Sequence, residues 1–214
     1  MLRLACERGW AGDAGKIAAF VDSNRGWLPD YALFMALKRH FCMKSWIEWP
    51  DEDARMRKSD VIEKYRRELD ADIRLFTWAQ YKFFEQWDAL REYVHSLGIE
   101  IIGDIPIYVA LDSADVWSDP RSFLLDERNV PTVGAGVPPD YFCADGQLWG
   151  NPIYDWAHMK SDGYGWWIRR IESAKRLYDV IRIDHFRGFD SYWAVPYGEE
   201  TAKNGEWRTG PGIG

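Results

Sequence analysis

Two short runs rich in β-branched residues most constrain the fold, IEIIGDIPIYVA at residues 99–110 and DVIRID at residues 179–184. Each run comes directly after a segment with helical periodicity. This order is typical of parallel α/β units, in which a helix leads into the next strand. Residues 163–178 supply the helix before the second run, so the order is helix, strand, insert, helix, strand. This order predicts an α/β fold, part of a (β/α)8 TIM barrel with helical and loop-rich inserted subdomains.

The rest of the pattern divides the 214 residues into four parts. These are a mainly helical insert and barrel helix region at 1–97, a barrel strand at 98–110, a loop-rich inserted subdomain at 111–162, and a barrel helix, a strand and a following loop at 163–214. The third part is too long for an ordinary loop, which is why it is interpreted as a subdomain.

The first part shows the clearest helical periodicity. Two helices are expected within residues 11–42, the second with Asp30 as its N-cap. A long helical region is expected from Ser59 to Leu97, where Gly98 supplies a stop. The apolar stripe of this long region is predicted to comprise Leu69, Ile73, Phe76, Phe83, Phe84, Trp87, Leu90 and Val94.

Composition excludes several classes of function. The net charge is −7 and the basic residues are scattered, which argues against nucleic acid or an anionic membrane as a partner. Three widely spaced cysteines without a CxxC pattern indicate neither a disulfide framework nor a zinc site, so a reducing, cytoplasmic location is expected. No apolar run reaches the ~18 residues of a membrane span, and the N-terminus does not resemble a signal peptide.

Arg182 and Asp184 stand two positions apart in an otherwise apolar strand. Alternate side chains of a strand share a face, so these two groups point the same way, about 6 to 7 Å apart. Asp184 ends the strand, and the carboxyl ends of barrel strands carry catalytic groups because the following loops converge there. The pair is therefore a candidate catalytic site.

Asp104 occupies the corresponding place at the end of the earlier strand, so two carboxylates are expected at the same mouth of the barrel. A guanidinium near Asp184 favours its ionised form, which suits a carboxylate nucleophile better than a proton donor. The structural alternatives are an ion pair that closes the barrel end and, for Asp104, a cap of the turn before Pro106.

A metal site is not predicted. Asp184 and His185 resemble a ligand pair, but adjacent strand residues face opposite sides of a sheet. The histidines also occur in unrelated settings, at His40, His95, His158 and His185. No other cofactor is indicated either.

Residues 136–156 concentrate aromatic side chains beside proline and glycine. The aromatic residues are Tyr141, Phe142, Trp149, Tyr154 and Trp156. Rigid aromatic faces next to amide and carboxylate groups suit sugar rings, which have apolar faces and hydroxyl edges. The alternative is that some of these rings form the core of an irregular subdomain.

Four extended motifs, in this order, resemble glycoside hydrolase family 77, the 4-alpha-glucanotransferases also called amylomaltases or disproportionating enzymes. They are WLPDYALFMALK, GDIPIYVALDSADVW, GVPPDYFCADGQLWGNPIYDW and VIRIDHFRGFDSYWAVP, followed by GEWRTGPG. The resemblance covers the chain from about Trp27 onward. It implies that a segment of an α-1,4-glucan is held covalently on the enzyme and then transferred to the 4-hydroxyl of another glucan, without a cofactor.

The resemblance also assigns roles to residues of this sequence. Asp184 corresponds to the family's nucleophile, Arg182 to the residue that positions it, and Asp104 to a sugar-contacting aspartate. The other substrate contacts that it implies are Tyr141, Phe142, Gln147 and Trp149, in a loop similar to the family's acceptor-side loop, and His185 next to the nucleophile. Malto-oligosaccharides and other α-1,4-glucans are the expected partners.

Some family features are missing. The family's acid/base carboxyl and a third carboxylate lie in segments after the one that matches GPG, and its opening barrel strands precede Trp27. Cys143 stands where the family more often has Ser. The chain is therefore expected to be an internal fragment of a longer enzyme, inactive by itself. The alternative is a non-catalytic glucan-binding piece that keeps only the aromatic loop.

Overall fold

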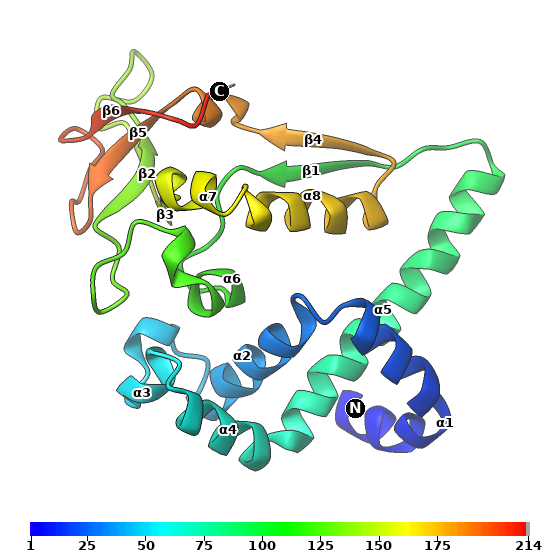
Figure 1. Cartoon of the computed structure of the whole chain (residues 1–214). Helices are drawn as coiled ribbons and strands as arrows, with labels where there is room; N and C mark the ends of the chain where they lie inside the picture. Colours follow the sequence, from blue (N-terminus) through cyan, green and yellow to red (C-terminus); the bar gives the residue numbers. More distant parts are fainter. Residues whose placement is uncertain (213–214) are drawn as a thin grey trace. The chain divides into compact units, whose positions relative to one another are not determined.

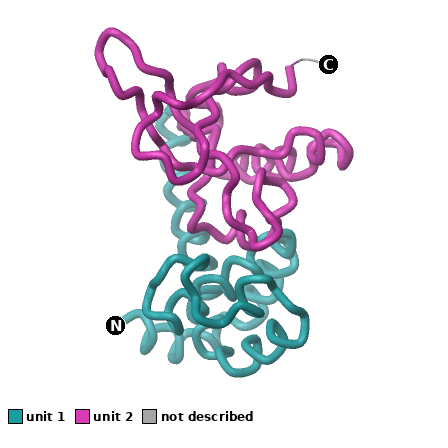
Figure 2. Tube along the Cα trace, turned by 90° about the vertical axis from the view of Figure 1, so that its left-hand side faces the viewer, with its two compact units in different colours: residues 1–99 teal, residues 100–214 magenta. Residues whose placement is uncertain are grey.

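The computed structural model describes residues 1–212 of the chain. The chain forms two compact units, Met1–Ile99 and Glu100–Gly214, coloured teal and magenta in Figure 2. Within the described residues, no helix combines the length and the apolar character that crossing a membrane requires.

The first unit is helical (Figure 1). Its elements are α1 (Leu2–Ser23), α2 (Leu28–His40), the 3-10 turn η1 (Trp46–Glu48), α3 (Glu52–Arg55), α4 (Ser59–Glu68) and α5 (Asp70–Ser96). Helices α1 and α2 pack against α5. The buried side chains between α1 and α5 are those of Cys6, Ile17, Leu75, Trp78 and Tyr81.

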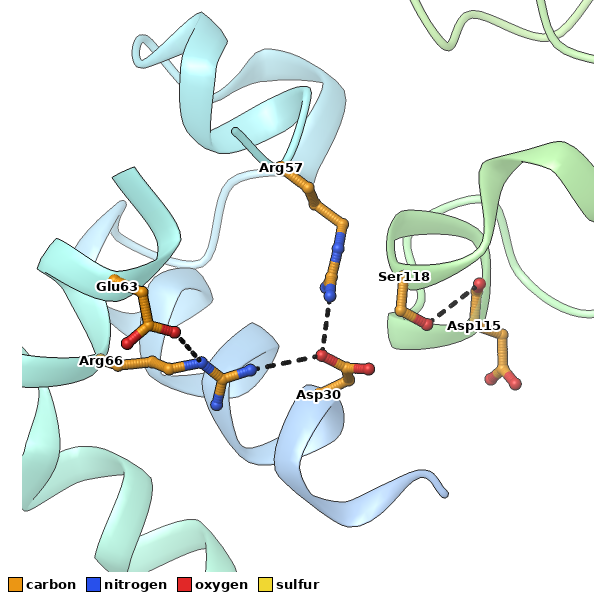
Figure 3. A network of polar contacts seen from close by, with 6 residues as sticks. All are labelled: Asp30, Arg57, Glu63, Arg66, Asp115 and Ser118. Atoms are coloured by element: carbon orange, nitrogen blue, oxygen red, sulfur yellow. Dashed lines mark hydrogen bonds and ion pairs between the residues drawn. The ribbon is translucent and has the colours of Figure 1, made fainter. Parts of the chain in front are cut away.

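The predicted role of Asp30 as an N-cap is wrong. The N-cap of α2 is Trp27, because Pro29 fits the first turn of a helix and lets α2 begin before Asp30. Asp30 instead accepts a hydrogen bond from Arg57 at 2.8 Å and forms an ion pair with Arg66 at 3.6 Å (Figure 3). Its carboxylate therefore joins α2 to the segments around α3 and α4.

The predicted helical region from Ser59 to Leu97 is confirmed, but it contains two helices, α4 and α5, because the chain breaks at Leu69, whose backbone has φ −105° and ψ 17°. The break and the packing of α1 and α2 decide which face of α5 is buried. That face carries Leu75 and Trp78, whereas the predicted stripe residues Phe83 and Leu90 are 48% and 50% exposed. The predicted stripe is therefore wrong at Phe83 and Leu90, whereas its other six residues are partly buried and its Phe84 packs against Phe20.

Within its described residues, the second unit contains two sheets (Figure 1). Its strands are β1 (Ile102–Pro106), β2 (Val133–Val137), β3 (Gln147–Pro152), β4 (Val180–Asp184), β5 (Ser191–Pro196) and β6 (Glu206–Thr209). Its helices are α6 (Ala114–Ser118), α7 (Trp156–Ser161) and α8 (Gly165–Leu177), with 3-10 turns η2 (Pro120–Ser122) and η3 (Phe186–Phe189).

The predicted pair of parallel strands is confirmed. Strand β1 pairs with β4, and the partners include Asp104 with Arg182 and Pro106 with Asp184. Helix α8 precedes β4 and packs against it, as the sequence rhythm of helix and strand indicated. The carboxyl ends of both strands therefore lie at one edge of this sheet.

The second sheet differs from the sequence expectation. It is antiparallel with the order β3-β2-β5-β6, so it includes residues 147–152 of the predicted aromatic loop. It also includes residues 191–209, which were expected to form a loop after the catalytic strand. The strand β2 has the sequence VGAGV, and its glycines provide no alternation of polar and apolar side chains that would indicate a strand.

The two glycines of β2 provide a matched test of this sheet. A Cβ added at Gly136 would lie 2.6 Å from the backbone oxygen of Gln147 on β3, whereas at Gly134 it would lie 3.5 Å from its nearest neighbour, an ordinary contact. We expect Gly136→Ala to lower the free energy of unfolding by about 1 to 3 kcal/mol, and Gly134→Ala to change it by less than about 1 kcal/mol. Thermal or urea unfolding measures both, and equal effects would contradict the close approach of β3 to Gly136.

Candidate active site

One guanidinium joins the two predicted carboxylates at the edge of the parallel sheet. Arg182 Nε lies 3.4 Å from Asp104 Oδ1, and Arg182 Nη2 lies 3.3 Å from Asp184 Oδ1. All three side chains are more than half exposed. The register explains this arrangement, because Asp104 is paired with Arg182 across the strands and Asp184 shares the face of Arg182.

The end of β1 is held in place by Arg170 of α8. Its Nη1 donates hydrogen bonds to the Ile107 carbonyl at 2.9 Å and to the Tyr154 hydroxyl oxygen at 3.2 Å. The Tyr154 hydroxyl in turn donates to the same carbonyl at 2.6 Å. The guanidinium also lies over the Trp167 ring, 4.9 Å from its centroid. This network ties the strand end that follows Asp104 to α8.

The sequence interpretation did not include Arg170. The sequence does contain an indication of its stacking role, because Arg170 follows Trp166 and Trp167 on the helix that leads into β4. A cation beside two indole rings in an amphipathic helix indicates stacking, but not which carbonyl groups it contacts.

His185 does not follow the alternation of β4. Its φ is +53°, a left-handed conformation, and the strand ends at the preceding residue. Strand alternation therefore does not apply to His185, and the argument from it about Asp184 and His185 rested on a wrong strand boundary. Among residues 1–212 the structure contains no group of three or more His, Cys, Asp or Glu side chains placed to hold a metal ion.

The His185 ring meets Trp149 of β3 edge to face, with 4.8 Å between the ring centroids. Burial lowers the pKa of His185 below its ordinary value of 6.5, the charge of Asp184 opposes this change, and Arg187 adds to it. The imidazole is therefore neutral at pH 7 and can both donate and accept a hydrogen bond.

The lowered pKa of His185 predicts a dependence of stability on pH. Unfolded histidine binds a proton near pH 6.5, before the folded side chain does, so acid favours the unfolded state. We expect the contribution of His185 to be complete above about pH 6.5 and to be lost as pH falls from there toward the lowered pKa of the folded protein. Urea unfolding between about pH 7.5 and pH 5.5 should show a smaller loss of stability for His185→Gln than for the unaltered protein. If the free energy of unfolding changed with pH equally in His185→Gln and in the unaltered protein, the burial of this imidazole would be contradicted.

Tyr141 and Phe142 are 97% and 93% exposed on a turn between β2 and β3. Their rings meet edge to face, 5.6 Å apart. The turn is ordered by Asp140, whose Oδ1 accepts hydrogen bonds from the backbone N–H groups of Phe142 and Cys143, both at 2.8 Å. Local hydrogen bonds thus present two aromatic faces to solvent.

Gln147 and Trp149 lie on β3 and point to one face, since they are two residues apart. Trp149 Nε1 donates to Gln147 Oε1 at 3.1 Å, and Trp149 is 37% exposed. The structure thus brings Gln147 and Trp149 together with His185, next in the chain to Asp184.

Tyr154, which the sequence suggested as a ligand-facing ring, is fully buried. It packs against Phe123, Trp166 and Trp167 and belongs to the core of this unit. Trp156 is half-buried beside Tyr154, with 5.0 Å between ring centroids. The sequence shows that rings cluster here, but their burial depends on the packing of α8.

Known proteins resemble this chain closely. A family model described as 4-alpha-glucanotransferase matches residues 1–213. The 4-alpha-glucanotransferase of Clostridium butyricum is 50% identical over 93% of this chain and 41% of its own length. That of Thermus thermophilus is 47% identical over 91% of this chain and 39% of its own length. The chain thus spans about two fifths of the length of these curated relatives.

A solved structure, the amylomaltase from Streptococcus agalactiae in complex with acarbose, matches with a TM-score of 0.90 at 43% identity. The match covers 92% of this chain and 40% of that one. It confirms the predicted fold class, an α/β chain that forms part of a (β/α)8 TIM barrel.

Proposed function

The chain belongs to the 4-alpha-glucanotransferase family, glycoside hydrolase family 77, and from this membership we propose that the complete protein transfers a segment of an α-1,4-glucan to the 4-hydroxyl of another glucan or of glucose. The observation that carries the proposal is the guanidinium of Arg182, which contacts the carboxylates of both Asp104 and Asp184. A carboxylate held beside a cation at the carboxyl end of a barrel strand is suited to nucleophilic attack.

In the proposed mechanism, the Asp184 carboxylate attacks the anomeric carbon of the donor and the glycosidic bond breaks. The donor segment is then joined to Asp184 as a covalent glycosyl ester, and the leaving oxygen takes a proton from a general acid. The carboxyl group of that general acid, now acting as a base, takes the proton of the acceptor's 4-hydroxyl, and this oxygen attacks the anomeric carbon from the face opposite Asp184. The bond to Asp184 breaks and its carboxylate is released, so two inversions retain the anomeric configuration. Arg182 orients Asp184 and stabilises its charge, and Asp104 contacts a sugar hydroxyl.

We infer the general acid and the third carboxylate to lie in the part of the family's sequence that follows GPG. A retaining enzyme needs the acid about 5 to 5.5 Å from the nucleophile. Carboxyl groups supply both the nucleophile and the proton transfers, so the proposed reaction needs neither a metal nor an organic cofactor.

Malto-oligosaccharides and other α-1,4-glucans are the proposed substrates. The Streptococcus agalactiae relative was solved in complex with acarbose, which supports an oligosaccharide ligand. Tyr141 and Phe142 are proposed to stack on the acceptor, and Gln147, Trp149 and His185 to contact the chain near the nucleophile. The cysteine pattern of the sequence supports a cytoplasmic location.

Incubating the complete protein with maltotriose tests the proposal. We expect glucose together with longer malto-oligosaccharides, because each donor segment is passed to another glucan. Glucose and maltose alone would show hydrolysis rather than transfer. Binding of maltotriose without any product would favour the non-catalytic, glucan-binding alternative.

A further inference from the structure

A small cavity lies beside the turn that follows β4. Its volume is about 160 Å³. The residues that line it are Gly136, Val137, Pro138, Asp140, His185, Arg187, Trp193 and Trp207. These residues come from four places in the chain: β2 and the turn after it, the turn after β4, β5, and β6. We name it the Trp207 pocket.

Trp193 and Trp207 line one part of the pocket, and contacts hold Trp193 in place. Trp193 and Trp207 are paired across β5 and β6, and their rings meet edge to face at 5.5 Å. Trp193 Nε1 donates a hydrogen bond to the Ala202 carbonyl at 2.8 Å, and the ring lies so close to Gly205 that a Cβ there would be 2.2 Å from Nε1. Trp193 is thus held in place, whereas Trp207 is 47% exposed.

Polar groups stand beside these rings. The Arg187 guanidinium lies over the Trp207 ring, 4.4 Å from its centroid, and offers several N–H donors. Asp140 offers carboxylate oxygens, and the neutral imidazole of His185 offers a donor and an acceptor. Aromatic faces beside such groups match a hexose ring, which has apolar faces and a rim of hydroxyl groups.

Two of the residues that line the pocket are neighbours in the sequence of residues with a role in the proposed reaction. His185 lines the pocket and directly follows the proposed nucleophile Asp184. Asp140 lines it as well and directly precedes Tyr141, on the turn proposed to meet the acceptor. The pocket is therefore lined both by the residue that follows Asp184 and by the residue that precedes Tyr141.

We propose that the Trp207 pocket binds one glucosyl unit of the acceptor glucan, with Trp207 stacking on the sugar face and Arg187 donating to its hydroxyl groups. The inference rests on the proposed function and adds a binding site to it. It also explains why two tryptophans stand on neighbouring strands at the edge of a sheet.

Calorimetric titration of the complete protein with maltotetraose tests the pocket, in an Asp184→Asn background that prevents turnover. Trp207→Leu should weaken binding at least about fivefold, because it removes an aromatic stacking face. Trp207→Tyr should recover much of that loss, since it restores such a face. Tyr197→Leu is the matched control: Tyr197 is similarly exposed, at 44%, but does not line the pocket, so binding should not change.

With Asp184 intact, Trp207→Leu should raise the KM for a maltose acceptor and leave kcat nearly unchanged. Unchanged maltotetraose affinity for Trp207→Leu would overturn the pocket, and so would a loss that Tyr does not recover, which would mark a merely structural role. In either case, transfer by the unaltered protein would still support the proposed function. A failure of the proposed function is distinct, because the unaltered protein itself would then give no transfer.

Discussion

Replacing Asp184 by Asn is expected to lower transfer from maltotriose by the complete protein by at least about three orders of magnitude. The amide keeps the size of the carboxylate and part of its hydrogen bonding, but it cannot form the glycosyl ester. Substrate contacts elsewhere are unaffected, so maltotriose binding should persist. Chromatography of the products over time measures the first effect, and calorimetry measures the second.

Asp190→Asn is the matched control for this substitution. Asp190 lies six residues after Asp184, the last residue of β4. It is exposed and accepts a hydrogen bond from Ser191 Oγ at 3.1 Å. Transfer by this control should remain close to normal. Near-normal transfer by Asp184→Asn would remove Asp184 from the role of nucleophile, whatever family the chain belongs to.

Arg182→Ala should have the second largest effect, a loss of about two to three orders of magnitude in kcat. The guanidinium touches Asp104 and Asp184 at once, at 3.4 and 3.3 Å. Without it, two carboxylates remain at one strand edge with no cation between them, and Asp184 loses its orienting partner. Initial rates of glucose release from maltotriose give the magnitude.

Two further measurements separate this role from a structural one. Arg182→Lys keeps the charge but not the forked donor geometry, so we expect activity between that of Ala and that of Arg. Added guanidinium ions should restore part of the Arg182→Ala activity, because the vacated space lies at an exposed edge. If Arg182→Ala were fully active, or were inactive solely through a lower melting temperature, Arg182 would be an ion-pair residue without a part in the chemistry.

Local sequence determined the sheet edge that carries Asp104 and Asp184. A short apolar strand after a helix, with charges at alternate positions, already predicted that β1 and β4 are parallel neighbours with Asp104 and Asp184 at one end. This succeeds because strand alternation and the join between helix and strand depend on residues a few positions apart. The same reasoning failed at Leu69, where the helix breaks, and at His185, whose left-handed backbone leaves the alternation.

Tertiary structure alone decided the surroundings of that edge. The sheet β3-β2-β5-β6 joins residues 133–152 to residues 191–209, and the glycines of β2 give no period by which such a pairing could be recognised. It places Trp207 on Trp193 and leaves it exposed, whereas the packing of α8 buries Tyr154 completely. Equivalent aromatic residues in the sequence thus became core or candidate ligand contacts, because burial depends on which distant segments pack together and not on neighbouring residues.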